Sequence, residues 1–161
     1  MTKVRDGFET NSSSSHSVVI SDSDNVFTDV AYLGQLELDG ETLHVEGETT
    51  FGWEWELWSM PGDKLNYILI DNDNDPSVRE RLVNLIKEKT GVKYVDFPGV
   101  DNAKEYEAYV DHESRGTSRD VLELDDDDLW KFIMNPESSF RGGNDNDDGP
   151  WSTYYDAVDD D

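Results

Sequence analysis

Two polar strings that lie far apart in the sequence contain the residue types from which a nucleophilic active site is built. The first runs from residue 11 to residue 17 and places a histidine among serines, and the second is an Asp-His-Glu-Ser string at 111–114. A serine hydroxyl becomes a nucleophile when a histidine takes its proton, and a carboxylate can orient that histidine. The candidate catalytic residues are His16, His112 and Asp111. The candidate binding residues are Asn11, Ser12 and Ser14.

Each string also has a purely structural interpretation. Turns select serine and asparagine, so residues 11–17 are also typical of a solvated turn. The string at 111–114 follows a predicted strand and is also typical of a strand-end turn. The acidic neighbours of His112 should raise its pKa, which suits acid–base chemistry near neutrality. A catalytic triad is defined by geometry, so the two interpretations stay open for both strings.

Two Asp/Asn runs offer the oxygen ligands that hard cations prefer. The run at 71–75 begins like an EF-hand loop, but Pro76 replaces the required glycine and Leu82 replaces the bidentate glutamate. It is therefore not an EF-hand, and its structural interpretation is a helix-capping loop. Either this run or the run at 144–149 could hold Ca²⁺ or Mg²⁺ loosely, so we expect either no cofactor or a loosely bound ion. The candidates are Asn144 and Asp145 for binding, and Asp145 and Asp147 for metal.

An aromatic segment at 51–58 alternates large apolar and small or acidic residues, which predicts a strand. Its odd positions are expected to face the core: Phe51, Trp53, Trp55 and Leu57. Trp58 falls on the opposite face and is a candidate for binding a partner. Stacking of nucleic-acid bases on this strand is disfavoured, because Glu54 and Glu56 are interleaved with the aromatic rings.

The elements that must position these residues follow from periodicity and turn chemistry. Residues 36–45 predict a hairpin with a type I′ turn at Asp39-Gly40, in which Leu36 pairs with Leu43. Strands are predicted at 66–70, 92–97 and 106–110. A helix is predicted at 76–90, where Asp75 is the N-cap and Gly91 ends the helix. A second helix is predicted at 126–134.

These elements predict one α+β domain over residues 1–155, with a mainly antiparallel sheet and two helices, followed by an acidic tail at 156–161. The chain of 161 residues has a net charge of -25. Such a charge can indicate disorder, but 5 Trp, 7 Tyr and 6 Phe favour a folded core. There are 12 acids and 2 bases in residues 1–60, 10 and 7 in 61–110, and 16 and 4 in 111–161. Acidity is thus concentrated in the outer thirds.

Composition also excludes several classes of function. A strongly negative surface repels nucleic acids and anionic membranes, so direct binding to either is not expected, whereas a basic protein partner is. The chain has no cysteine, which excludes thiolate chemistry. Its apolar runs are too short to span a bilayer, and no signal-peptide pattern is present, which predicts a cytoplasmic protein. No glycine-rich phosphate loop or zinc-ligand spacing occurs.

The string from Phe8 to Ser17, Phe-Glu-Thr-Asn-Ser-Ser-Ser-Ser-His-Ser, resembles the opening of a group of small uncharacterised proteins from tailed phages and their hosts. The similarity extends to residues 64–70, 111–114 and 143–146. The resemblance implies a phage-type origin, with a location in the host cytoplasm or in the virion, and implies no activity. It gives more weight to a functional role for His16, His112 and Asn144.

Three functions remain open. The first is a non-enzymatic binder of a basic host protein, which could act as a DNA mimic or inhibitor. The second is a virion or housekeeping protein whose acidity is an adaptation to high salt. The third is a hydrolase or nucleotide-modifying enzyme that uses the Ser, His and Asp residues of the two strings.

Overall fold

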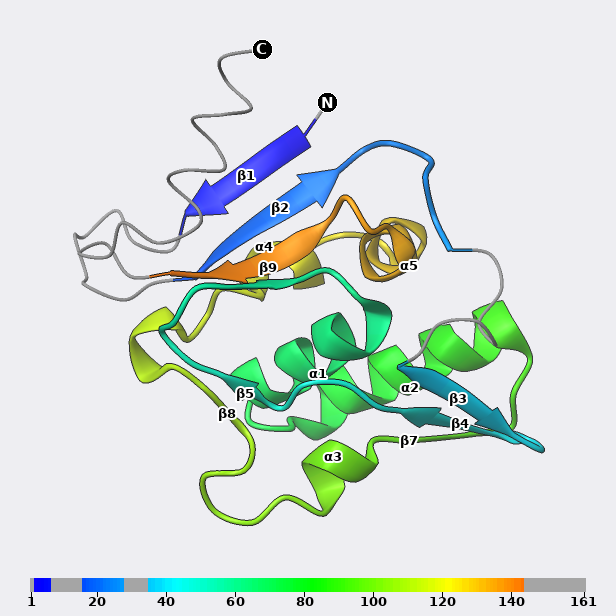
Figure 1. The fold of residues 1–161 in the computed structure, drawn as a ribbon. Coiled ribbons are helices and arrows are strands. Elements are labelled where there is room, and N and C mark those ends of the chain that lie inside the picture. Colours follow the sequence, from blue (N-terminus) through cyan, green and yellow to red (C-terminus); the bar gives the residue numbers. More distant parts are fainter. Residues whose placement is uncertain (1, 7–15, 28–34, 144–161) are drawn as a thin grey trace.

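The chain folds as an α+β protein in which short, mainly antiparallel sheets enclose a central helix (Figure 1). The computed structural model describes the backbone of residues 2–6, 16–27 and 35–143. Its strands are β1 (Thr2–Asp6), β2 (Ser17–Ser21), β3 (Leu36–Asp39), β4 (Thr42–Val45), β5 (Thr50–Phe51), β6 (Glu56–Trp58), β7 (Tyr94–Asp96), β8 (Tyr109–Val110) and β9 (Ser139–Gly142). Its α-helices are α1 (Pro61–Asp71), α2 (Pro76–Thr90), α3 (Pro98–Asp101), α4 (Arg119–Leu122) and α5 (Asp126–Met134).

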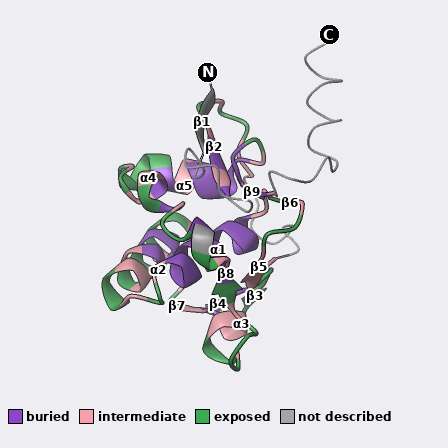
Figure 2. Ribbon diagram, turned by 90° about the vertical axis from the view of Figure 1, so that its left-hand side faces the viewer, coloured by how far each residue is buried: buried purple, intermediate pink, exposed green. Residues whose placement is uncertain are grey.

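Helix α1 forms the centre of the core, and every one of its residues is buried. It lies between the sheet that contains β2 and β9 and the hairpin of β3 and β4, and Figure 2 shows the other buried segments around it. The strand predicted at 66–70 is therefore wrong. The apolar run at 68–70 suits a buried helix as well as a strand, because a helix covered on all sides has no polar face. Pro61 in the first turn and Asp63 behind it are helix-start signals that the prediction missed.

The two predicted helices are confirmed at their predicted bounds. Asp75 is the N-cap of α2 and accepts hydrogen bonds from the amides of Ser77 and Val78. Gly91 ends α2 with a left-handed φ of 80°. Asp125 caps α5 by accepting from the amide of Asp128. Besides α1, the structure adds the single-turn helices α3 and α4, which are too short to have a hydrophobic period.

The strands form three small sheets. The largest has the order β1-β2-β9-β6 and is antiparallel throughout, so it joins strands from both ends of the described chain. The second has the order β3-β4-β7, in which β7 is parallel to β4, and the third pairs β5 and β8 in parallel. The predicted strands at 92–97 and 106–110 are present as the shorter β7 and β8.

The hairpin of β3 and β4 is present, but its register differs from the prediction. Leu36 pairs with Val45, and Leu38 pairs with Leu43, so the two loop residues are 40 and 41. Gly40 has a φ of 62° and is the only loop residue with a positive φ, which is typical of a type II′ turn. The shift is two residues, so the predicted apolar face is kept, although Leu38 at its end is exposed.

The predicted continuous strand at 51–58 is wrong. The chain bends between β5 and β6, so the alternation changes sides: Phe51 is buried, Trp53 is 50% exposed and Leu57 is 48% exposed. Trp58 is buried instead and packs edge-on against Phe51. A period-2 pattern cannot reveal such a bend, because each half of the segment still alternates.

No helix in the described part of the chain is long and apolar enough to cross a bilayer. The predicted boundary at residue 155, the acidic tail and the candidates in residues 11–14 and 144–147 lie outside the described residues.

Candidate functional site

His16 lies in the core directly before β2 and is completely buried. Its Nδ1 is 2.6 Å from the hydroxyl of Tyr67, and its Nε2 is 2.6 Å from the carbonyl oxygen of Gly52. A carbonyl only accepts hydrogen bonds, so Nε2 carries the proton and Nδ1 accepts from Tyr67. The ring also packs edge-on against Trp58, with 5.2 Å between the ring centroids.

Burial sets the protonation of this histidine. Loss of hydration lowers the pKa of His16, and the Gly52 carbonyl and the charges of Asp111 and Asp71 oppose that effect only in part. In this arrangement His16 cannot take a proton from a serine without breaking the bond from Tyr67. The histidine therefore acts here as a structural link between α1 and the bend after β5.

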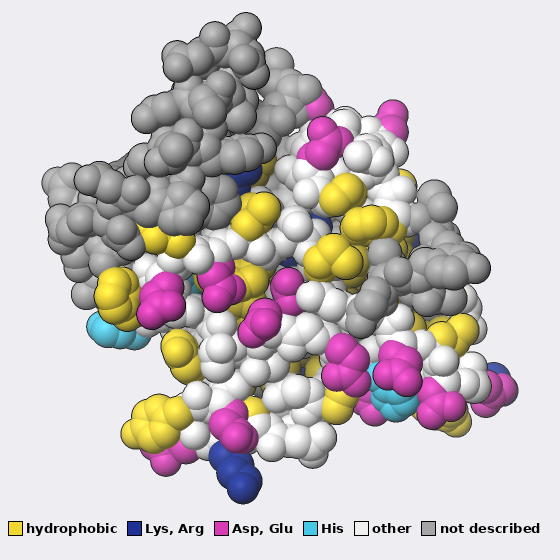
Figure 3. Space-filling view, viewed as in Figure 1, with side chains coloured by type: hydrophobic (Ala, Val, Ile, Leu, Met, Phe, Trp, Pro, Cys, Tyr) yellow, Lys and Arg dark blue, Asp and Glu magenta, His cyan; other side chains and the backbone are white. Residues whose placement is uncertain are grey.

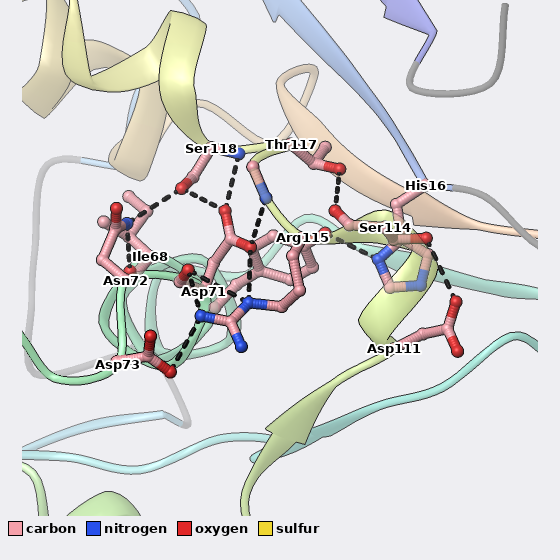
Figure 4. A network of polar contacts seen from close by, with 12 residues as sticks. His16, Ile68, Asp71, Asn72, Asp73, Asp111, Ser114, Arg115, Thr117 and Ser118 are labelled. Carbon is pink, nitrogen blue, oxygen red and sulfur yellow. Dashed lines mark hydrogen bonds and ion pairs between the residues drawn. The ribbon is translucent and has the colours of Figure 1, made fainter. Parts of the chain in front are cut away.

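The residues of the string at 111–114 differ in their exposure to solvent. The side chain of His112 is 88% exposed, with its Nδ1 3.9 Å from an oxygen of Asp111. Ser114 is buried, and its hydroxyl donates to Asp111 over 3.4 Å. Asp111 faces the same region as His16 (Figure 4), and its charge partly opposes the lowering of the His16 pKa, while His112 is exposed to solvent.

A buried carboxylate, that of Asp71, fastens the loop at 115–118 to the end of α1 (Figure 4). It accepts hydrogen bonds from the amides of Gly116 and Ser118, at 2.8 and 2.9 Å, and from the Ser118 hydroxyl at 2.5 Å. Arg115 donates to the Asp71 carbonyl and forms an ion pair with Asp73 at 2.9 Å. The predicted capping role of residues 71–75 is confirmed by Asp75, and Asp71 adds a second structural role.

The described residues contain no group of three or more His, Asp or Glu side chains placed to hold a metal ion. In the run at 71–75 the oxygens of Asp71, Asn74 and Asp75 accept hydrogen bonds from the protein itself. The candidate ion ligands of the second run, Asp145 and Asp147, lie outside the described residues.

A cavity of about 190 Å³ opens at the bend between β5 and β6. Its walls come from three strands and the bend, because β5 pairs with β8 and brings Thr50 beside Tyr109. Aromatic rings and carboxylates share the lining: Thr50, Gly52, Trp53, Glu54, Glu56, Trp58 and Tyr109. Trp53 and Tyr109 are 50% and 43% exposed, so part of each ring is accessible from the cavity.

Trp58 forms the inner wall of this cavity and is only 2% exposed. Its indole N–H donates to a Glu56 oxygen at 2.8 Å. The predicted surface role of Trp58 is therefore corrected: its ring is a core residue with one edge at the cavity. Sequence reasoning did not single out Trp53, Tyr109, Glu54 or Glu56 as a site. The only signal for them was the mixture of aromatic and acidic residues at 53–58.

Comparison of the chain with protein-family models, with curated proteins and with solved structures finds no match. The function is therefore inferred from the fold and from the geometry of these residues.

Proposed function

We propose that this protein is a non-enzymatic binder of a basic protein partner. The observation that carries the proposal is that much of its positive charge is already neutralised internally, while its acids remain in excess. The ion pairs that use surface cations are Arg79–Asp101, Arg81–Asp126, Lys89–Asp127, Lys93–Glu41, Arg115–Asp73 and Lys131–Asp24. Lys64 is buried in the core.

The remaining acids are distributed over several elements. Exposed examples lie on β3, in the bend, on β6, on α2 and near α5: Glu37, Glu54, Glu56, Glu80, Glu88, Glu123 and Asp128. The face in Figure 3 shows acidic and hydrophobic side chains close together, with few Lys or Arg side chains among them. Such a surface attracts a basic partner and speeds its encounter, and it repels nucleic acids and anionic membranes.

The candidate catalytic residues give weaker support to an enzyme. Both ring nitrogens of His16 are engaged in the core, and His112 is exposed. Mimicry of DNA would need regular rows of free carboxylates. In the described acidic row at 125–128, Asp126 and Asp127 are paired with cations of α2. Binding of a basic protein is the more general proposal, and competition with DNA tests the narrower one.

The protein, immobilised through a tag, would be used to capture partners from a bacterial lysate treated with nuclease. The captured protein would then be purified and its affinity measured with and without competing duplex DNA. We expect a basic partner that binds directly. Competition by DNA would identify a mimic, and its absence would identify a partner bound through another basic surface.

Two outcomes would overturn the proposal. One is that no captured protein that binds directly when purified is basic. The other is that a double variant with fewer charges, Glu80→Gln/Glu88→Gln on α2, retains more partner than the natural protein does, because removal of negative charge should never strengthen this binding.

A further inference from the structure

The cavity at the bend between β5 and β6 combines aromatic walls with carboxylates at its rim. We propose that it holds an arginine side chain of the basic partner. This inference rests on the proposed function and names the group that the partner inserts. Two features carry it: the rings of Trp53, Trp58 and Tyr109, and the carboxylates of Glu54 and Glu56.

The rings provide surfaces for a cation. The face of an aromatic ring is negative, so a guanidinium within about 6 Å of the ring centre is attracted to it, most strongly by tryptophan. Trp53 and Tyr109 are about half-exposed. Insertion of a side chain between them would cover this apolar surface as well as satisfy the charge.

The carboxylates provide the hydrogen-bond acceptors. One oxygen of Glu56 accepts from the Trp58 indole, which fixes the side chain and leaves its other oxygen available to a ligand. Glu54 is exposed two residues earlier in the chain. Glu56 also repels a carboxylate outside the lining, because burial and the charges of Asp63 and Glu56 raise the pKa of Glu48. A cation in the cavity would relieve this repulsion.

The volume of the cavity suits a single inserted side chain. About 190 Å³ is smaller than the range of roughly 300–1,000 Å³ that is usual for sites of drug-sized ligands. A single long side chain fits such a volume better than a nucleotide does. A metal ion would be a poor occupant, because aromatic rings would replace most of its oxygen ligands.

Arginine suits this lining better than lysine. Its guanidinium is planar, so it stacks on aromatic rings and at the same time donates a fork of N–H groups to carboxylates. A lysine ammonium is more strongly hydrated and has no flat surface to stack. We therefore expect lysine to bind more weakly at the same position.

Core residues support the inner wall of the cavity, which Trp58 forms. His16 binds the carbonyl of Gly52 and packs against Trp58, so the first candidate from the sequence supports the inner wall. Gly142 on β9 lies against the same wall. A Cβ at this position would approach within 2.8 Å of the Trp58 ring and of the Glu54 carbonyl oxygen, so only glycine fits there.

The test uses the full chain and three short peptides that differ at one position: Gly-Gly-Arg-Gly-Gly and its lysine and citrulline counterparts, each with blocked ends. Citrulline has the shape of arginine without its charge. Binding is followed by the NMR shifts of the tryptophan indole N–H groups and by tryptophan fluorescence. We expect the arginine peptide to shift the Trp53 and Trp58 signals, lysine to bind several-fold more weakly and citrulline to bind least.

Exposed residues of the cavity provide variants that should fold. Trp53→Ala should weaken arginine binding about fivefold to thirtyfold, and Glu54→Gln/Glu56→Gln should weaken it by a similar factor. The matched controls lie elsewhere on the surface. Tyr94→Ala removes a ring that is 61% exposed on β7, and Glu80→Gln/Glu88→Gln removes two charges from α2. Both controls should leave the affinity within about twofold of the natural protein.

The outcomes separate this inference from the proposed function. If the arginine peptide leaves the Trp53 and Trp58 signals unchanged, or if the control variants weaken it as much as the cavity variants do, the inference is overturned. Capture of a basic partner that is unaffected by Trp53→Ala would leave the proposed function standing and reject the cavity as the contact. Arginine binding in the cavity without any basic protein partner would instead support a site for a free small cation and would reject the proposed function.

Discussion

The two histidines whose pKa values shift do so in opposite directions, for reasons visible at each ring. His16 is buried, so loss of hydration lowers its pKa below 6.5. His44 lies at the surface of the hairpin, where its hydrogen bond of 2.6 Å to Asp96 raises its pKa above 6.5. Burial and an acidic partner therefore have opposite effects on the same side chain.

We predict that an NMR titration of the histidine ring protons will give a midpoint below 6.5 for His16 and above 6.5 for His44.

The effects of the two histidines on the free energy of unfolding also differ in sign. The unfolded chain binds the proton of His16 first, so stability is lost as the pH falls through 6.5. The contribution of His44 is present below 6.5 and is lost as the pH rises through its folded pKa. His44→Asn should therefore cost more stability at pH 5.5 than at pH 8.5. Equal midpoints for the two rings would contradict this account.

Lys64 is a buried cation whose three N–H groups all have partners. Its ammonium donates to the carbonyl oxygens of Phe132, Asn135 and Ser138, at 2.7, 2.8 and 3.0 Å. Three acceptors require the protonated form, although burial lowers the pKa of Lys64 well below its ordinary value. The lysine thus satisfies the carbonyl groups at the end of α5.

Replacement of this lysine by methionine keeps the length of the side chain and removes its three donors. We predict that Lys64→Met lowers the free energy of unfolding by about 3 kcal/mol, because buried carbonyls are left unsatisfied. Urea unfolding followed by tryptophan fluorescence measures the loss. Lys87→Met on the surface of α2 is the control and should change stability by less than about 0.5 kcal/mol. Similar losses in the two variants would show that the buried bonds contribute little.

At the scale of elements, the loop at 115–118 is fastened to the core chiefly by Asp71. We predict that Asp71→Ala lowers the free energy of unfolding by about 3 kcal/mol, since the buried amide and hydroxyl of Ser118 and the partly buried amide of Gly116 lose their acceptor. Its neighbour Asp73 is 82% exposed and pairs with Arg115 at the surface. Asp73→Asn is therefore the control, because asparagine tolerates the φ of 55° at this position, and it should cost under about 1 kcal/mol by thermal or urea unfolding. An equal cost at both positions would contradict the proposed role of Asp71.

Elements with local signals at their ends could be predicted from the sequence, and buried elements could not. Helix α2 has its capping aspartate and its terminal glycine, and α5 has its acidic first turn, so both were predicted at their observed bounds. Helix α1 is covered on all sides, and its apolar run at 68–70 has no period that distinguishes a helix from a strand. The hairpin was predicted with the correct face, but its register depended on a turn type that Asp39-Gly40 does not fix alone.

The candidate site could be predicted even less, because it depends on a bend and on a pairing between distant strands. Tyr109 reaches the cavity through the pairing of β8 with β5, which no local pattern reveals. The bend exposes Trp53 and buries Trp58, the opposite of the predicted alternation. The sequence did identify His16, but as a candidate catalyst, since its burial and its two partners arise only from the tertiary fold.

At the scale of the whole molecule, a net charge of -25 produces repulsion that opposes folding. We predict that added NaCl raises the free energy of unfolding, mostly below about 0.5 M, because screening is already nearly complete there. The protein should be folded at about 0.15 M. A protein adapted to high salt would behave differently: it would unfold at low salt and gain stability up to molar concentrations. Denaturant unfolding at several NaCl concentrations distinguishes these two behaviours. Unfolding at low salt, with stability that rises up to molar NaCl, would favour adaptation to high salt as the explanation of the acidity.

The salt dependence of the affinity for the captured partner tests the central claim most directly. It would be measured by calorimetry with the purified natural protein and partner, at NaCl concentrations from about 0.05 to 0.4 M. If uncompensated carboxylates provide the contact, the affinity should fall about tenfold or more over this range. An affinity that is unchanged across the range, at constant stability of both proteins, would contradict the account.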